Sequence, residues 1–285
     1  MKKKHILILT QALIVTGLIF AVGCKKKDHS PSDSGNSTSL SLTIEATDVI
    51  DIYNSSSDIV TAKVILYYYD DYDTHNEDVI VSVPYQNNGF KIELPANLDS
   101  KYLKSLSDIF ENTDINVSDR SAKCYGYLED IEGYDKYKDN IGWFSLNNGY
   151  HLIDWGWDEW NGSCITWLYV DKDVIIEGSD YNKYVYNYPD NSRCVDIIEE
   201  HFDLNCKKGW NVMYYSYSYS YNYSETTNTT TNTYIYRYTS QKPSGIDYNW
   251  YYYSYDHYKK SGNTNHRNRT FGNLQQRKIC KLSGQ

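Results

Sequence analysis

The sequence has little of what marks several common protein classes. Its 285 residues include only 5 Pro and 16 Gly, which excludes a collagen-like or polyproline rod. Basic residues are outnumbered, with 28 Lys and Arg against 37 Asp and Glu, so the charge argues against a nucleic-acid-binding protein. The alternating helical segments that a doubly wound α/β fold requires are also missing.

Motifs of catalysis and cofactor binding are missing as well. The sequence contains no nucleophile elbow, no paired-histidine metal motif and no phosphate-binding loop. We therefore predict no catalytic residue, no cofactor and no metal, and we interpret the cluster 199–201 as a solvated turn. Acidic groups at 70–78 and 130–139 could offer oxygen ligands to Ca²⁺, but neither has EF-hand spacing. We interpret both groups as acidic hairpin tips.

Tyrosine, by contrast, is abundant, with 32 residues in the chain. Aromatic and β-branched residues favour strands, and their alternation with polar residues predicts strands at 42–47, 60–67 and 79–83. Asn88-Gly89 predicts a type I′ turn that joins the last of these in a hairpin to a strand at 90–94. The one predicted helix covers 100–110.

The most regular pattern lies between 215 and 238. Tyrosine alternates with serine and asparagine over 215–223, and the alternation returns over 234–238 beyond a segment rich in threonine and asparagine. This predicts a long hairpin with two tyrosine rows side by side, which either close a sandwich face or form a binding stripe. Together the strands predict a mainly β protein, an antiparallel β-sandwich (one large or two small), with at most one or two short helices.

The N-terminal residues predict export and lipidation. Three lysines precede an apolar run of 17 residues, Ile6–Val22, and Ala21-Val-Gly-Cys24 resembles a lipobox. We predict a lipoprotein signal peptide at 1–23 and acylation of Cys24, whose acyl chains would hold the protein to membrane lipid. An uncleaved membrane anchor is the alternative. Residue 25 is Lys, and not the Asp that favours retention of a lipoprotein in the inner membrane. We therefore expect the protein at the outer membrane, on either its periplasmic or its surface face.

Composition divides the rest of the chain into three parts. Residues 24–40 are Ser-rich and predict a flexible tether. Residues 41–256 form the predicted β-sandwich body, with a boundary near 112–120 if there are two sandwiches. Residues 257–285 hold seven Lys and Arg and no acid, which leaves 18 Lys and Arg against 37 Asp and Glu in 24–256. We predict a basic, disordered tail that could touch anionic lipid.

Several short motifs together resemble those of a protein group. They are Cys24 with its Ser-rich tether, Asn88-Gly-Phe-Lys-Ile-Glu-Leu-Pro95, Tyr169-Val-Asp-Lys-Asp-Val174, Lys207-Lys-Gly-Trp-Asn211 and Lys242-Pro-Ser-Gly245. Over most of 1–256 the chain resembles uncharacterised lipoproteins of Bacteroides and relatives. The segment 89–95 is also similar to a hairpin of transthyretin-like and carboxypeptidase-regulatory β-domains. The resemblance implies a β-domain at the cell envelope, and it implies no activity.

Tryptophan clusters in one segment, because five of the 7 Trp lie between 143 and 167. Flat rings beside carboxylates suit sugar binding, since sugar C–H faces stack on rings and hydroxyl groups need acceptors. Alternatively, these tryptophans could belong to the hydrophobic core. If the protein is an enzyme, Asp154, Asp158 and Glu159 could supply the carboxylate pair of a glycan hydrolase. The candidate glycan-binding residues are Trp155, Trp157, Trp160, Asp154 and Asp158.

Cysteine offers one further candidate site. An exported compartment permits disulfides, and Cys194 and Cys206 could pair across a turn, with buried free thiols as the alternative.

The sequence as a whole predicts a membrane-anchored lipoprotein that acts as a non-catalytic binding or structural module. Its partner would be a glycan or an envelope protein. A surface glycan-degrading hydrolase is the alternative function.

Overall fold

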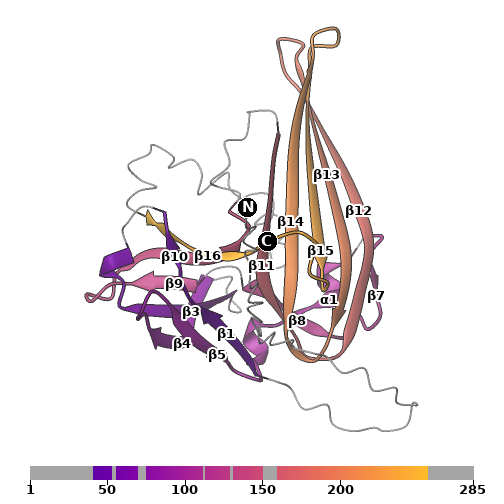
Figure 1. The fold of residues 1–285 in the computed structure, drawn as a ribbon. Coiled ribbons are helices and arrows are strands. Elements are labelled where there is room, and N and C mark those ends of the chain that lie inside the picture. The colour runs from indigo at the N-terminus through magenta and orange to yellow at the C-terminus, as the bar shows by residue number, and fades with distance from the viewer. Residues whose placement is uncertain are drawn as a thin grey trace, which may run out of the picture. The chain divides into compact units, whose positions relative to one another are not determined.

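The computed structural model describes residues 41–52, 56–69, 75–111, 113–128, 131–149 and 159–255 (Figure 1). All of them belong to one compact unit. Strands dominate this unit and form layered sheets with almost no helix, which confirms the predicted mainly β, sandwich-like class. Within these ranges no helix is long and apolar enough to cross a membrane.

The first layered region consists of a small sheet over part of a large one. The small sheet pairs β1 (Leu42–Ala46) with β5 (Phe90–Leu94). Buried Ile44 and Ile92 share one core cluster with Leu66, Phe144 and Tyr252 of the large sheet. The large-sheet strands here are β3 (Thr61–Tyr69), β4 (His75–Pro84), β9 (Ile131–Tyr134), β10 (Asn140–Asn147) and β16 (Asn249–Ser254); β2 (Ile50–Asp51) joins β16, and the 3-10 turn η1 (Ser56–Asp58) precedes β3.

The predicted hairpin at Asn88-Gly89 is wrong in its position and in its partner. Asn87 and Asn88 are the two residues with positive φ, 51° and 59°, one position earlier than predicted. Gly89 follows them because a Cβ there would lie 2.1 Å from the carbonyl oxygen of Ala46. Strand β5 then pairs with β1 and not with β4, so the turn carries the chain from one sheet to the other.

The predicted helix at 100–110 is broken into three pieces. They are a 3-10 turn, η2 (Ser100–Tyr102), a short strand, β6 (Lys104–Ser105), and one turn of helix, α1 (Leu106–Ile109). Pairing of β6 with β8 (Lys123–Leu128) interrupts the helix. Ser105 caps α1, because its side chain accepts a hydrogen bond from the backbone N–H of Ser107.

The second layered region is built on long strands. Their order in the sheet is β11, β14, β15, β13, β12, β7, and only the β13–β15 pair among them is parallel. Strand β11 also pairs with β10 and β8, so it connects the two regions in one sheet. The bounds are β11 (Glu159–Val170), β12 (Val174–Asn187), β13 (Arg193–Cys206), β14 (Gly209–Ser224), β15 (Thr229–Thr239) and β7 (Asn116–Val117).

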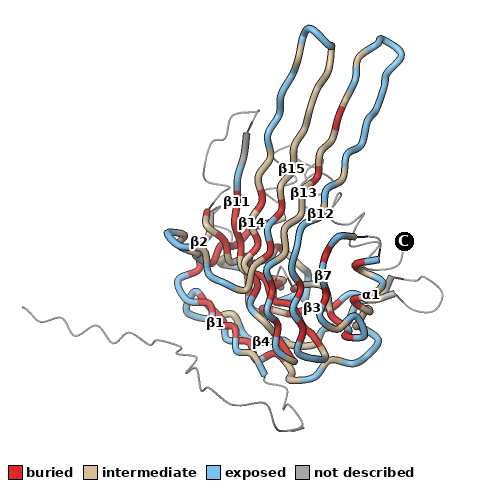
Figure 2. The backbone as a smooth tube through the Cα atoms, turned by 90° about the vertical axis from the view of Figure 1, so that its right-hand side faces the viewer, coloured by how far each residue is buried: buried red, intermediate tan, exposed pale blue. Residues whose placement is uncertain are grey.

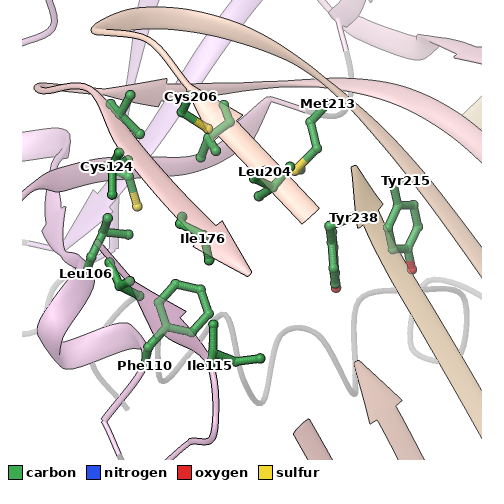
Figure 3. Packing of buried hydrophobic residues seen from close by; sticks show 14 of the residues in the cluster. Leu106, Phe110, Ile115, Cys124, Ile176, Leu204, Cys206, Met213, Tyr215 and Tyr238 are labelled. Atoms are coloured by element: carbon green, nitrogen blue, oxygen red, sulfur yellow. The ribbon is translucent and has the colours of Figure 1, made fainter. Parts of the chain in front are cut away.

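A second core cluster lies between these long strands and the segment that contains α1 (Figure 3). Leu106 and Phe110 contribute from that segment, and Tyr215 and Tyr238 contribute from the sheet. The two tyrosines are directly opposite each other, with ring centroids 5.2 Å apart. The predicted tyrosine hairpin is therefore confirmed, and its inner residues close a core face.

The inner tyrosine row requires a glycine on the neighbouring strand. Gly162 of β11 lies opposite Tyr217 of β14, and a Cβ on Gly162 would fall 2.3 Å from the Tyr217 ring. The ring is buried, with 5% of the residue exposed, so it has little room to move aside.

We expect Gly162→Ala to destabilise the protein by about 1–3 kcal/mol, because the added methyl group displaces a packed ring. Gly126→Ala in β8 is the matched control, since nothing lies within 4 Å of a Cβ at Gly126. That control should leave stability unchanged or raise it by up to about 1 kcal/mol. Urea unfolding measures both, and equal effects of the two substitutions would contradict the proposed packing.

Candidate functional site

The four strands β12–β15 run together beyond their core to two hairpin tips (Figure 1). The described part of β11 pairs with β14 as far as Ser220, and β7 pairs with β12 at Ile176 and Glu177. Buried residues concentrate at the base of these strands, and exposed or half-buried residues predominate toward the tips (Figure 2). We call the outer part the blade, which comprises residues 180–187, 193–200, 217–224 and 229–236.

Register places one set of side chains on a single face of the blade. Tyr223 lies opposite Thr230, Thr230 opposite Cys194, and Cys194 opposite Tyr186. The next row on this face lies two residues closer to the core. There Tyr221 lies opposite Asn232, Asn232 opposite Asp196, and Asp196 opposite Tyr184. Because side chains alternate along a strand, these rows share a face with the buried tyrosines of the core. We call it the tyrosine face, with Tyr184, Tyr186, Tyr219, Tyr221, Tyr223 and Tyr234 as its aromatic residues.

Four of these tyrosines are open to solvent. Tyr184, Tyr186, Tyr221 and Tyr223 are 43, 44, 38 and 49% exposed. Tyr219 and Tyr234 stand one row closer to the core, half-buried, with their rings 5.1 Å apart. Contiguous exposed aromatic surface on a protein commonly marks a contact site.

Polar groups fill the space between the rings. Asp196 accepts a hydrogen bond from Nδ2 of Asn232 at 2.8 Å, and the Sγ of Cys194 lies 3.6 Å from the same carboxylate oxygen. Oδ1 of Asn232 in turn accepts from the hydroxyl group of Tyr219 at 3.0 Å. This chain of hydrogen bonds fixes an amide and a carboxylate among the rings, where both can accept from a ligand.

Two more carboxylates lie on the same face, nearer the core. Asp180 and Glu200 are directly opposite each other on β12 and β13, and both are half-buried. Nδ2 of Asn182 donates to Asp180 at 2.8 Å. Burial and the charge of Glu200 raise the pKa of Tyr236 to about 12. Burial and Asp196 likewise raise the pKa of Tyr234 well above its usual value. The phenols of Tyr234 and Tyr236 therefore stay neutral hydrogen-bond donors.

The predicted tryptophan site falls mostly outside the described residues. Asp154, Trp155, Trp157 and Asp158 all lie there. Trp160 belongs to β11, and its Cα lies opposite that of Tyr219 on β14. The predicted segment thus ends in register with the tyrosine face. Two other tryptophans of the cluster pack within the first layered region: Trp167 is buried, and Trp143 stacks on Tyr253 at 5.2 Å.

The predicted pairing of Cys194 with Cys206 is wrong. Both thiols are free, and the two residues stand at opposite ends of the single strand β13. An extended strand of this length separates its ends by roughly 40 Å, far beyond disulfide reach. The turn expected between them is absent. Cys206 is buried in the core, whereas Cys194 is half-buried on the tyrosine face. Cys24, the predicted lipidation site, lies outside the described residues.

The acidic groups considered for Ca²⁺ hold local contacts where the structure describes them. Asp78 pairs with Lys101 at 2.6 Å, and Asp135 accepts from the backbone N–H groups of Tyr137 and Asp139 in its own turn. Among the described residues no group of three or more His, Cys, Asp or Glu could hold a metal ion. Asp70, Asp71, Asp73 and Asp130 lie outside them.

The β12–β13 half of the blade was missed by the sequence reasoning. The cluster at 199–201, interpreted as a turn, is the middle of β13, with Glu200 on one face and Glu199 and His201 on the other. A signal was present in Tyr188-Pro-Asp-Asn191, turn-forming residues between two runs rich in aromatic and β-branched residues.

Comparisons of the chain with protein-family models, curated proteins and solved structures find no match. Function must therefore be argued from the side chains.

The raised pKa of Tyr236 predicts a loss of stability in alkali. The folded state keeps this proton up to about pH 12, while an unfolded tyrosine releases it near pH 10. Tyr236 therefore contributes stability that is fully present below pH ~10 and is lost as the pH rises toward ~12. We expect Tyr236→Phe to reduce this loss by up to about 2 kcal/mol. Urea unfolding between pH 9 and pH 12 measures it, and parallel pH profiles would refute it.

Proposed function

We propose that this protein is a membrane-anchored lipoprotein and a non-catalytic binding module of the cell envelope, with a glycan as its ligand. The apolar run before Cys24 and its lipobox-like residues support the anchor. The tyrosine face supports the binding function. Its four exposed tyrosines, carried beyond the core on paired strands, are the observation on which the proposal rests.

The chemistry of this face suits a sugar. Exposed rings offer flat apolar surfaces to the C–H faces of a pyranose. Asp196 and Asn232 lie between the rings and can accept hydrogen bonds from hydroxyl groups. The strands hold the rings in fixed rows, so little ordering is needed when a ligand binds.

One observation favours the alternative of a glycan hydrolase. Asp180 and Glu200 lie directly opposite each other, and such pairs have Cβ atoms about 4.5–5.5 Å apart. Retaining glycosidases use two carboxyl groups about 5–5.5 Å apart. The binding module remains the first proposal because it accounts for the exposed tyrosines at the tips, several rows away from this pair. Release of new reducing ends from a bound glycan, lost in Glu200→Gln, would favour the hydrolase.

We expect Tyr221→Ala combined with Tyr223→Ala to abolish binding on a glycan array, because it removes two of the exposed rings. Tyr181→Ala is the matched control. Tyr181 is 56% exposed on the same blade, but it lies opposite Glu199 and so on the other face. Unchanged binding by the double variant, or an equal loss in the control, would rule out the tyrosine face as the site.

The anchor has a separate test. In cells that lipidate proteins, Cys24→Ser should remove the acyl mass from the mature chain and move the protein from the membrane to the soluble fraction. Cys280→Ser is the control and should change neither property. Intact-mass spectrometry together with membrane fractionation measures both. A wild-type chain without acyl mass would contradict the lipoprotein proposal.

A further inference from the structure

We propose that the tyrosine face is selective for a glycan that carries free, protonated amino groups. This inference rests on the proposed function and names the ligand class of the same site. It follows from the distribution of charge over the blade, from the chemistry of tyrosine rings toward cations, and from a contact of the same kind elsewhere in the molecule.

Three carboxylates share the tyrosine face. Asp180 and Glu200 form one opposed pair, and Asp196 lies four residues further along β13. At about 3.3 Å per residue, Asp196 is roughly 13 Å from Glu200 along the strand. Negative charge is therefore spread along the face over a length that several sugar units would cover.

Among the described residues, the Lys and Arg side chains of the blade belong to its other face. Lys183 lies opposite Ile197, and Arg193 lies opposite Asn187. These positions alternate with Tyr184, Tyr186 and Cys194, so both cations project away from the tyrosines. Over the described residues of the blade, the tyrosine face carries no Lys or Arg. The carboxylates described on this face would repel an anionic sugar and attract an ammonium group.

Tyrosine rings add to this preference. A cation over the face of an aromatic ring is stabilised by the ring quadrupole. The protein contains such a contact in its first layered region. Nζ of Lys63 lies 3.4 Å from the ring centroid of Tyr134, and the hydroxyl group of Tyr134 donates to Glu132 at 2.7 Å. The tyrosine face offers the same combination of rings and carboxylates, and the proposed ligand would bring the ammonium groups.

The test compares two oligosaccharides that differ only at their 2-amino groups, which are free in one and acetylated in the other, and the salt dependence isolates the contribution of charge. A β-1,4-linked glucosamine hexamer and its fully N-acetylated form share backbone and length, but only the first carries ammonium groups. At pH 6 and low salt, calorimetry should show the amine form binding about tenfold tighter, and ~1 M NaCl should remove most of that preference. Glu200→Gln should reduce the preference severalfold. Glu199→Gln, the adjacent residue on the other face, should leave it unchanged.

The possible outcomes separate the two proposals. Equal affinity for both hexamers would overturn the amine inference and leave glycan binding in place. Failure of both hexamers, together with an empty glycan array, would overturn the proposed function and with it the inference. Binding of a polylysine peptide but of neither hexamer would do the same and would indicate a basic protein as the partner. A preference that is equally reduced by Glu199→Gln would overturn the assignment to this face.

Discussion

The register of β14 is the constraint on which the long-strand region depends. Its tyrosines occupy every second position, so a single register decides whether they or the serines enter the core. Pairing with β11 on one side and β15 on the other sets that register over almost the whole strand. The close approach of Tyr217 to Gly162 reinforces it, because a one-residue slip would remove the ring from the glycine. The buried and the exposed tyrosines therefore share one cause.

The parallel pairing of β13 with β15 extends this face to a second hairpin. The chain leaves β13 and enters β14 through a short connection, but β15 inserts between them. As a result, β12 and β13 lie beside the tyrosine hairpin and add Tyr184 and Tyr186 to its face. Rows of side chains then run across four strands, and residues 36 positions apart in sequence, such as Cys194 and Thr230, become neighbours.

The alternation of residues predicted strands where the structure depends on that alternation. The alternation over 215–223 is sufficient to predict the tyrosine hairpin, because the strand has one buried face over much of its length, whereas the register that pairs Tyr215 with Tyr238 comes from the structure. Strand β12 carries no such alternation, since both of its faces meet solvent near the tip, and no periodicity marks it. In the same way, Lys104 and Ser105 have no local signal for a strand. Their pairing with β8 is a tertiary contact that overrides helix propensity.

Turn chemistry was similarly ambiguous at one position. Asn87, Asn88 and Gly89 all tolerate positive φ, so the sequence allows two registers of the same turn. Contact of Gly89 with the backbone of Ala46 selects between them, and that contact exists only once β1 and β5 have paired. Glu200 illustrates the same dependence in the candidate site. Its position opposite Asp180 follows from the β12–β13 register, and the residues near Glu200 in sequence do not predict that register.

The outer rows of the blade differ energetically from the inner rows. Tyr215 and Tyr217 are buried, so their area contributes to folding. Tyr221 and Tyr223 belong to the same alternation but remain exposed, so they leave apolar surface in water. Such an extension adds little to the core and favours aggregation. Among the described residues the extension carries acids and no bases between its rings, a distribution that the proposed ligand contact accounts for and the needs of folding do not.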